Sequence, residues 1–180
     1  MKHAKLIAWT GTLLAVSLFA TSCFSKGRTI PEKAEAVTPF DASRYLGTWY
    51  EVARFDFKFE RGLSKTTANY TLNEDGSIKV INRGYNAEKG KWKEAEGKAV
   101  FIGDPNIAML KVSFFGPFYT GYNVIAIDPE YKYALVAGKN LDYLWLLSRE
   151  PTMPQEIIDQ YLAIAKAIGY DTSRLLWVEQ

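Results

Sequence analysis

The sequence predicts an all-β fold: an eight-stranded up-and-down antiparallel β-barrel with one C-terminal α-helix packed outside it. Aromatic residues, which favour strands and apolar pockets, make up 14% of the 180 residues. Between residues 47 and 148, runs of strand-forming residues alternate with turn signals, and no ten-residue helical pattern interrupts them. The hydrophobic period changes to that of an amphipathic helix only after these strands. A closed barrel also removes the exposed edges of an open sheet.

Residues 1–22 have the pattern of a secretory signal peptide. Lys2 and Lys5 form a basic start, residues 6–20 carry no charge, and small residues lead to Cys23. The uncharged run is shorter than the about 20 apolar residues that a transmembrane helix needs. Cleavage would remove two of the 22 basic residues and none of the 20 acidic ones, so the formal net charge would fall from +2 to 0. No basic field then remains for binding nucleic acid.

The residues leading to Cys23, Ala-Thr-Ser-Cys, resemble the lipobox of bacterial lipoproteins. The resemblance implies that the chain is cut before Cys23 and that this residue carries acyl chains, enough for stable anchoring. Phe24 stands where enteric bacteria use Asp to retain lipoproteins in the inner membrane, which implies the outer membrane, with the protein facing the periplasm. We expect residues 23–39 to be the lipidated cysteine and a tether, and residues 40–180 to be the folded domain. The alternative is an ordinary signal peptide with an incidental cysteine.

Eight strands are expected between short turns. The turn signals include Asn-Glu-Asp-Gly at residues 73–76 and Asp-Pro-Asn at residues 104–106, which favour tight reversals of the chain. The predicted strands are residues 48–55, 66–72, 78–85, 92–102, 108–114, 122–127, 133–137 and 143–148.

The predicted helix follows the last of these strands. Thr152 stands three residues before Gln155, as in a capping box, and Pro154 suits the first turn. Gly169 is a suitable C-terminal stop, and residues 175–178 are expected to form a short final strand. The apolar residues at helical spacing, which should pack on the outside of the barrel, are Ile157, Tyr161, Ile164, Ala165 and Ile168.

Two motifs resemble those of the lipocalins, and in particular of their bacterial outer-membrane branch. Gly47-Thr48-Trp49, which opens the first strand, resembles the Gly-x-Trp signature of the family. Arg149, after the eighth strand, matches the lipocalin arginine that packs across this tryptophan at the closed end of the barrel. The resemblance covers residues 40–180 and implies a barrel that binds small hydrophobic molecules, namely fatty acids or lysophospholipids. For Gly47, Trp49 and Arg149 it implies a structural plug and not a binding site.

Side chains alternate between the two faces of a strand, so residues that share a face with Arg149 should point into the barrel. Three small residues expected there, Ala68, Ala126 and Ala134, favour open space. An eight-stranded barrel is either filled by side chains or holds one small ligand, and composition does not decide between the two. The ligand contacts expected from alternation and from the resemblance are Ala68, Tyr70, Val80, Asn82, Val112, Phe114, Tyr122, Val124, Val136, Tyr143 and Trp145.

One carboxylate is also expected inside the barrel. Glu51 has the same parity as the signature tryptophan, and a buried carboxylate needs a partner. Arg149 or a tyrosine could serve as that partner. For the ligand, whose polar head we expect at the open mouth, the candidates for polar contact are Asn82, Tyr122 and Tyr143.

Aromatic residues gather in two loops that should lie at the same end of the barrel, because loops of an up-and-down barrel alternate between its ends. The first loop contains Phe57 and Phe59, and the fifth contains Phe115 and Phe118. Exposed apolar patches usually mark contacts with lipid or protein. These residues therefore form either a rim that meets a membrane or a second subunit, or ordinary packing over the open end.

The scarcity of cysteine and histidine excludes several kinds of chemistry. Cys23 and His3 are the only residues of their types, so no intrachain disulfide, no zinc site of cysteine and histidine, and no Ser-His-Asp triad can form. We expect a lipid-binding protein and not an enzyme, without cofactor or metal, with a lipid ligand and a membrane as partners, and present as a monomer or homodimer. The alternatives are a structural envelope lipoprotein with a filled barrel and an enzyme-like barrel that uses Tyr, Asp or Glu.

Overall fold

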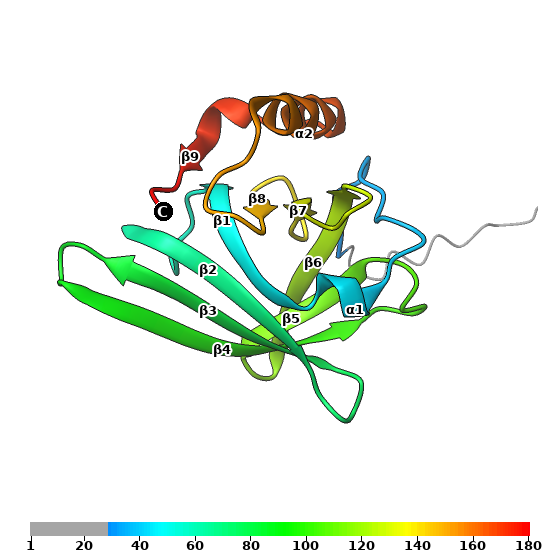
Figure 1. The fold of residues 1–180 in the computed structure, drawn as a ribbon. Helices are drawn as coiled ribbons and strands as arrows, with labels where there is room; N and C mark the ends of the chain where they lie inside the picture. The colour runs from blue at the N-terminus through cyan, green and yellow to red at the C-terminus, as the bar shows by residue number, and fades with distance from the viewer. Residues whose placement is uncertain (1–28) are drawn as a thin grey trace, which may run out of the picture.

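The chain forms a closed antiparallel barrel with one long helix against its outside (Figure 1). The computed structural model describes residues 29–180, so the predicted signal peptide and Cys23 lie outside the described residues. Strands pair in chain order from β2 to β8, β8 pairs with β1, and β1 pairs with β2, which closes the sheet. The predicted eight-stranded barrel is confirmed. Its strands are β1 (Gly47–Phe55), β2 (Leu63–Leu72), β3 (Ile78–Asn86), β4 (Lys91–Phe101), β5 (Met109–Phe115), β6 (Phe118–Ile127), β7 (Tyr133–Ala137) and β8 (Leu144–Ser148).

Four further elements flank the barrel. The short helix α1 (Ala42–Tyr45) precedes β1, and the longer helix α2 (Gln155–Ile168) follows β8. The 3-10 turn η1 (Thr172–Arg174) then leads into β9 (Leu175–Trp177), which pairs antiparallel with β1. None of the helices within residues 29–180 is long and apolar enough to cross a bilayer.

The structure confirms the predicted C-terminal end of α2 but not the predicted N-terminal cap. Gly169 ends the helix in the left-handed conformation, with a φ of 113°, as predicted. The capping role predicted for Thr152 is wrong, because the N-cap is Pro154 and no side chain caps the helix. The carbonyl oxygen of Thr152 instead accepts a hydrogen bond of 2.8 Å from the Ser148 hydroxyl, so Thr152 belongs to the turn that leaves β8.

Helix α2 covers an apolar patch on the outer face of the barrel. Tyr161 and Ala165 are buried there against outward residues of β7 and β8, including Leu135 and Leu146. The Tyr161 hydroxyl donates a hydrogen bond of 2.9 Å to the carbonyl oxygen of Tyr133. The molecule therefore has two cores, one outside the barrel under α2 and one inside it.

Two shifts in strand register change which side chains point inward. Between Glu51 and Ala53 the pairing of β1 with β8 slips by one residue, as at a β-bulge, and Arg54 then joins Glu51 in an ion pair. A second shift lies between Val124 and Ala126 in the pairing of β6 with β7. The expectation that Ala126 points inward is wrong, because this residue packs with the outer core.

Part of the predicted tether lies against the barrel. The amide of Val37 donates to the carbonyl oxygen of Val124, and the carbonyl oxygen of Val37 accepts from Ala108, both at 2.9 Å. Further toward the N-terminus, the Asn123 side chain donates a hydrogen bond of 2.7 Å to the carbonyl oxygen of Thr29. A Cβ atom at Gly121 would lie 1.8 Å from that same oxygen, so this close approach requires glycine. Residues 29–39 thus form a strap along the barrel and not a free linker.

Candidate ligand-binding cavity

The barrel encloses a cavity of about 690 Å³. Nine of the eleven side chains that were expected to contact ligand line it, which places them on one continuous inner surface. The other two, Val124 and Val136, are fully buried in the inner core that contains Trp49, and they do not border the cavity. The nine that line it are Ala68, Tyr70, Val80, Asn82, Val112, Phe114, Tyr122, Tyr143 and Trp145.

The closed end of the barrel is plugged by the signature tryptophan and arginine. Trp49 has no exposed surface, and the guanidinium carbon of Arg149 lies 3.9 Å from the centroid of its ring. Arg149 also donates hydrogen bonds of 2.8 Å to the carbonyl oxygens of Thr48 and Arg44. The indole N–H of Trp49 donates to the carbonyl oxygen of Tyr45 at 2.8 Å. The pair thus ties β1, α1 and the end of β8 together, and Arg149 does not line the cavity.

Three tyrosine hydroxyls meet beside this plug. The hydroxyl of Tyr122 lies 2.7 Å from the hydroxyls of both Tyr45 and Tyr70. Burial is the main cause that raises the pKa of all three phenols, so the hydroxyls stay neutral and bond to one another. This part of the cavity is therefore polar but uncharged.

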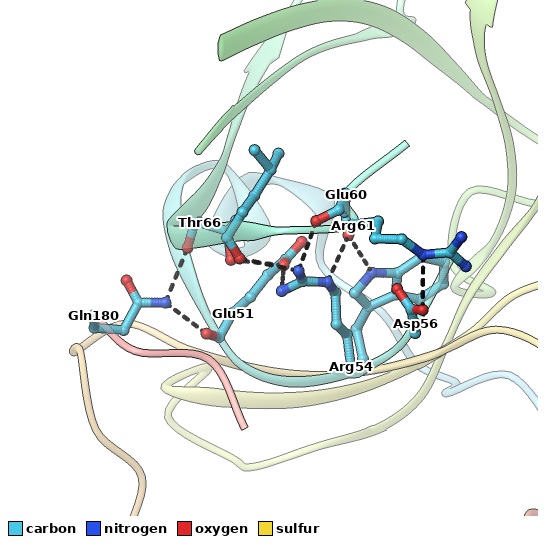
Figure 2. Close-up of polar contacts among 9 residues, drawn as sticks. Glu51, Arg54, Asp56, Glu60, Arg61, Thr66 and Gln180 are labelled. Carbon is cyan, nitrogen blue, oxygen red and sulfur yellow. Dashed lines mark hydrogen bonds and ion pairs between the residues drawn. The ribbon is translucent and has the colours of Figure 1, made fainter. Parts of the chain in front are cut away.

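A charged cluster interrupts the apolar wall, and Figure 2 shows its side chains directed toward one another. Glu51, Arg54 and Glu60 are each less than one-tenth exposed. The Glu51 carboxylate accepts a hydrogen bond of 2.7 Å from the Thr66 hydroxyl and lies 3.5 Å from Nη1 of Arg54. The Glu60 carboxylate lies 3.5 Å from Nε of Arg54 and accepts from the Trp145 indole at 3.4 Å. We call these three residues the Glu51–Arg54–Glu60 cluster.

Both carboxyls of this cluster hold their protons more tightly than usual. Burial raises the pKa of Glu60 well above its ordinary range, the charge of Glu51 adds to the rise, and Arg54 partly offsets it. Burial also raises the pKa of Glu51, against the effects of Arg54 and Thr66. Two carboxyls share one guanidinium, so retention of a proton by one of them relieves the excess negative charge.

The partner predicted for Glu51 is wrong. The carboxylate does point inward, but its partners are Thr66 and Arg54 and not Arg149 or a tyrosine. No face was predicted for Arg54. Strict alternation along β1 would place it on the outer face, and the register shift after Glu51 is the reason that it lies inside. Glu60 belongs to the first loop, where alternation gives no prediction. The one signal in the sequence that could have pointed to Arg54 is the general requirement that a buried carboxylate such as Glu51 has a cation nearby.

Arg54 also holds the β1–β2 loop against the barrel. Its Nη2 atom donates to the carbonyl oxygens of Glu60, at 2.8 Å, and Leu63, at 3.1 Å. At the other side of Glu51, the Gln180 side chain donates to the carbonyl oxygens of Glu51 and Thr66 (Figure 2). The cluster therefore fixes both a loop at the mouth and the C-terminal segment.

The aromatic rim at the open end divides into exposed and packed residues. Phe59, Phe115 and Phe118 are 64%, 64% and 79% exposed, and the rings of Phe59 and Phe115 lie 5.6 Å apart. Ordinary packing over the open end is therefore the wrong interpretation for these three. It is right for Phe57, whose ring packs edge-on against Trp145 at 5.5 Å.

Comparison with known sequences connects this geometry to a family. Residues 40–180 match the family described as a lipocalin-like domain. The chain is 59% identical to the outer membrane lipoprotein Blc of Citrobacter freundii, over 84% of this chain and 86% of that protein. It is 54% identical to the protein of the same name in Escherichia coli K12, over 93% and 97%. Apolipoprotein D of Rattus norvegicus is 34% identical, over 78% and 77%.

Comparison with solved structures gives the same architecture at low sequence identity. Insecticyanin from the tobacco hornworm Manduca sexta superposes with a TM-score of 0.66 at 20% identity, covering 82% of this chain and 84% of that one. Lobster apocrustacyanin A1 also has a TM-score of 0.66, at 17% identity, covering 84% and 91%. At such identities the likeness establishes the fold alone.

Proposed function

Because this chain belongs to the lipocalin family, we propose that it is a binding protein that takes one single-chain lipid into its barrel. The observation that carries the proposal is the cavity itself. Its volume of about 690 Å³ falls within the range of small-molecule sites, about 300–1,000 Å³. Residues such as Val80, Val112 and Phe114 give it an apolar wall. A barrel filled by its own side chains, the structural alternative, would leave no such volume.

Fatty acids and lysophospholipids are the ligands that suit this chamber. Each has one acyl chain for the apolar wall and one polar head that can lie toward the open end. Only one end is available for entry, since Trp49 and Arg149 fill the other. The chemistry proposed is therefore reversible binding for storage or transport, without a catalytic step.

We place the protein at the outer membrane of a bacterial cell envelope, anchored by lipid at Cys23 and facing the periplasm. The relatives in Citrobacter freundii and Escherichia coli are named outer membrane lipoproteins, and they align over most of this chain. The lipobox-like sequence before Cys23 supports the same anchor. Mass spectrometry of the protein from membranes should find acyl chains on Cys23, and an unmodified thiol at this residue would overturn the anchor.

Ligand titration tests the binding proposal. Delipidated protein should show saturable quenching of tryptophan fluorescence with a lysophospholipid and with a fatty acid, because Trp145 lines the cavity. Native mass spectrometry of the purified protein should show one co-purified lipid per chain. No quenching with either ligand would overturn the proposal.

A matched pair of variants makes the titration specific to the cavity. Val80→Phe adds volume at a residue that lines the chamber, and it should weaken binding. Leu72→Phe adds a ring on the same sheet at an exposed residue outside the chamber, and it should bind like the wild type. Equal affinities in the two variants would place the ligand elsewhere.

A further inference from the structure

The Glu51–Arg54–Glu60 cluster turns its carboxyls, and not its guanidinium, toward the cavity. Glu51 and Glu60 both line the cavity, whereas Arg54 does not. The Arg54 guanidinium contacts the carboxylates of Glu51 and Glu60 (Figure 2). It also donates hydrogen bonds to the carbonyl oxygens of Glu60 and Leu63. A molecule inside the barrel therefore meets two acidic groups in a wall that is otherwise mostly apolar.

A second acceptor lies on β3, which pairs with β2. The side-chain oxygen Oδ1 of Asn82 is buried and has no hydrogen-bond partner within the described part of the chain. Asn82 lines the same cavity and pairs with Ala68, which is the next inward residue after Thr66 on β2. A buried acceptor without a partner is destabilising relative to a satisfied one, because it has lost its hydrogen bonds to water. Because an amide oxygen can only accept hydrogen bonds, Oδ1 of Asn82 can be satisfied only by a donor.

The charges around Glu51 and Glu60 also leave room for a further hydrogen-bond donor. Within residues 29–180, the ion pairs of Glu51 and Glu60 run to Arg54 alone, so two carboxyls share one cation. The phenol of Tyr70 is affected by the charges of both carboxyls, and burial raises its pKa, so it stays neutral. The remaining cationic side chains that line the cavity are exposed and form no ion pair with Glu51 or Glu60: Lys58, Arg83, Lys93 and Lys139.

We propose that Glu51, Glu60 and Asn82 form an acceptor subsite that selects ligands by their polar group. The subsite binds a group that donates hydrogen bonds, an ammonium or a hydroxyl, and it disfavours a carboxylate, which would bring a further negative charge beside two acidic groups. This inference rests on the proposed function, because it ranks the ligands that the lipid chamber accepts: fatty acids should bind more weakly than single-chain lipids whose polar groups donate hydrogen bonds. It makes Glu60 a specificity-determining residue.

The test is a series of amphiphiles with the same fourteen-carbon chain and different polar groups. The amine, the monoacylglycerol, the fatty acid and its methyl ester, which has no donor, are titrated by tryptophan quenching below the concentrations at which they form micelles. The amine and the monoacylglycerol should each bind about tenfold more tightly than the fatty acid, as expected for one hydrogen bond to a charged group. An advantage of the amine alone would identify charge as the selected property, and an advantage of both would identify hydrogen-bond donation.

Glu60→Gln tests whether Glu60 is the residue that makes the protein prefer the amine over the fatty acid. This variant should reduce the advantage of the amine over the fatty acid to about twofold or less, because the acidic group is replaced by a neutral amide of the same shape. Glu156→Gln, an exposed residue in the first turn of α2, should keep the wild-type ratio. A ratio that survives Glu60→Gln, or equal binding of all four amphiphiles by the wild type, overturns the inference.

Proton linkage in the wild type provides a test that needs no variant. An ammonium beside Glu60 favours release of the proton that this carboxyl holds, so affinity for the amine should rise between about pH 5.5 and about pH 8. Affinity for the methyl ester should stay constant over the same range. If the ester binds saturably but the amine shows no rise, the lipid chamber stands and the acceptor subsite fails.

Discussion

A one-residue change of register determines the charge pattern inside the barrel. If β1 alternated throughout, Arg54 would point outward and Glu51 would be a buried carboxylate without a cation. The shift between Glu51 and Ala53 turns the guanidinium to within 3.5 Å of both carboxylates. Such a cluster is not a source of stability, because the desolvation of buried charges offsets their attraction. Its effects should therefore appear in pH dependence and ligand choice.

The raised pKa of Glu60 predicts that the protein becomes less stable as the pH rises. The folded state binds this proton more tightly than the unfolded state, for which the ordinary pKa is 4.5. The associated stability is fully present below that value and is lost as the pH rises through the raised pKa. Glu60→Gln cannot titrate, so its free energy of unfolding should fall less than that of the wild type between about pH 5 and about pH 8 in urea denaturation. Glu156→Gln is the control, and an unchanged slope in Glu60→Gln would contradict the assignment.

Replacement of Arg149 should lower the stability of the fold without changing its affinity for lipid. Arg149→Met removes three hydrogen bonds to backbone carbonyls and the contact with the Trp49 ring, and it should lower the free energy of unfolding by about 1–3 kcal/mol. Affinity for a single-chain lipid should stay within about twofold, because this residue does not line the cavity. Urea unfolding and tryptophan quenching measure the two quantities. Lys166→Met, at an exposed residue of α2, controls for the loss of one charge.

At the scale of elements, the strap formed by residues 29–39 depends on a single glycine. Gly121→Ala would place a methyl group 1.8 Å from the carbonyl oxygen of Thr29, so the N-terminal part of the strap should be displaced from β6. Hydrogen exchange should then be faster at Val37, whose amide bonds to Val124. Thr120→Ala changes the adjacent exposed side chain without adding an atom, and it should leave the exchange at Val37 unchanged. Equal exchange in both variants would show that the strap does not rely on this contact.

The sequence predicted the elements well where their residues alternate regularly. All eight strands and the end of α2 at Gly169 follow from period and turn chemistry, which are local properties. The prediction of interior residues failed at a register shift for Ala126, and Arg54, for which no prediction was made, lies just beyond another shift. A bulge has no reliable local signal, because pairing with the neighbouring strand determines it. The strap was missed for a related reason, since its bonds join residues far apart in the chain.

At the scale of the whole molecule, the barrel has one closed end and one open end. The closed end is tied by Trp49 and Arg149. The open end carries exposed phenylalanines: Phe59 in the β1–β2 loop, and Phe115 and Phe118 at the adjoining ends of β5 and β6, where a longer loop was predicted. A ligand in the cavity must therefore pass the rim to enter or leave. An apolar rim should lower the barrier for an acyl chain that moves between a membrane and the cavity, because the chain then spends less of its path in water.

This asymmetry predicts that the rim controls the rate of lipid transfer. Phe59→Ser and Phe118→Ser together should slow transfer of a fluorescent lysophospholipid from vesicles to the protein, while its affinity and the melting temperature stay close to those of the wild type. Both residues are largely exposed and make few contacts that support the fold. Trp177→Ser is the matched control, since this residue of β9 is 55% exposed but lies in the strand that follows α2 and not in a rim loop. Unchanged transfer in the double variant would mean that the ligand reaches the cavity without contact between the rim and the membrane.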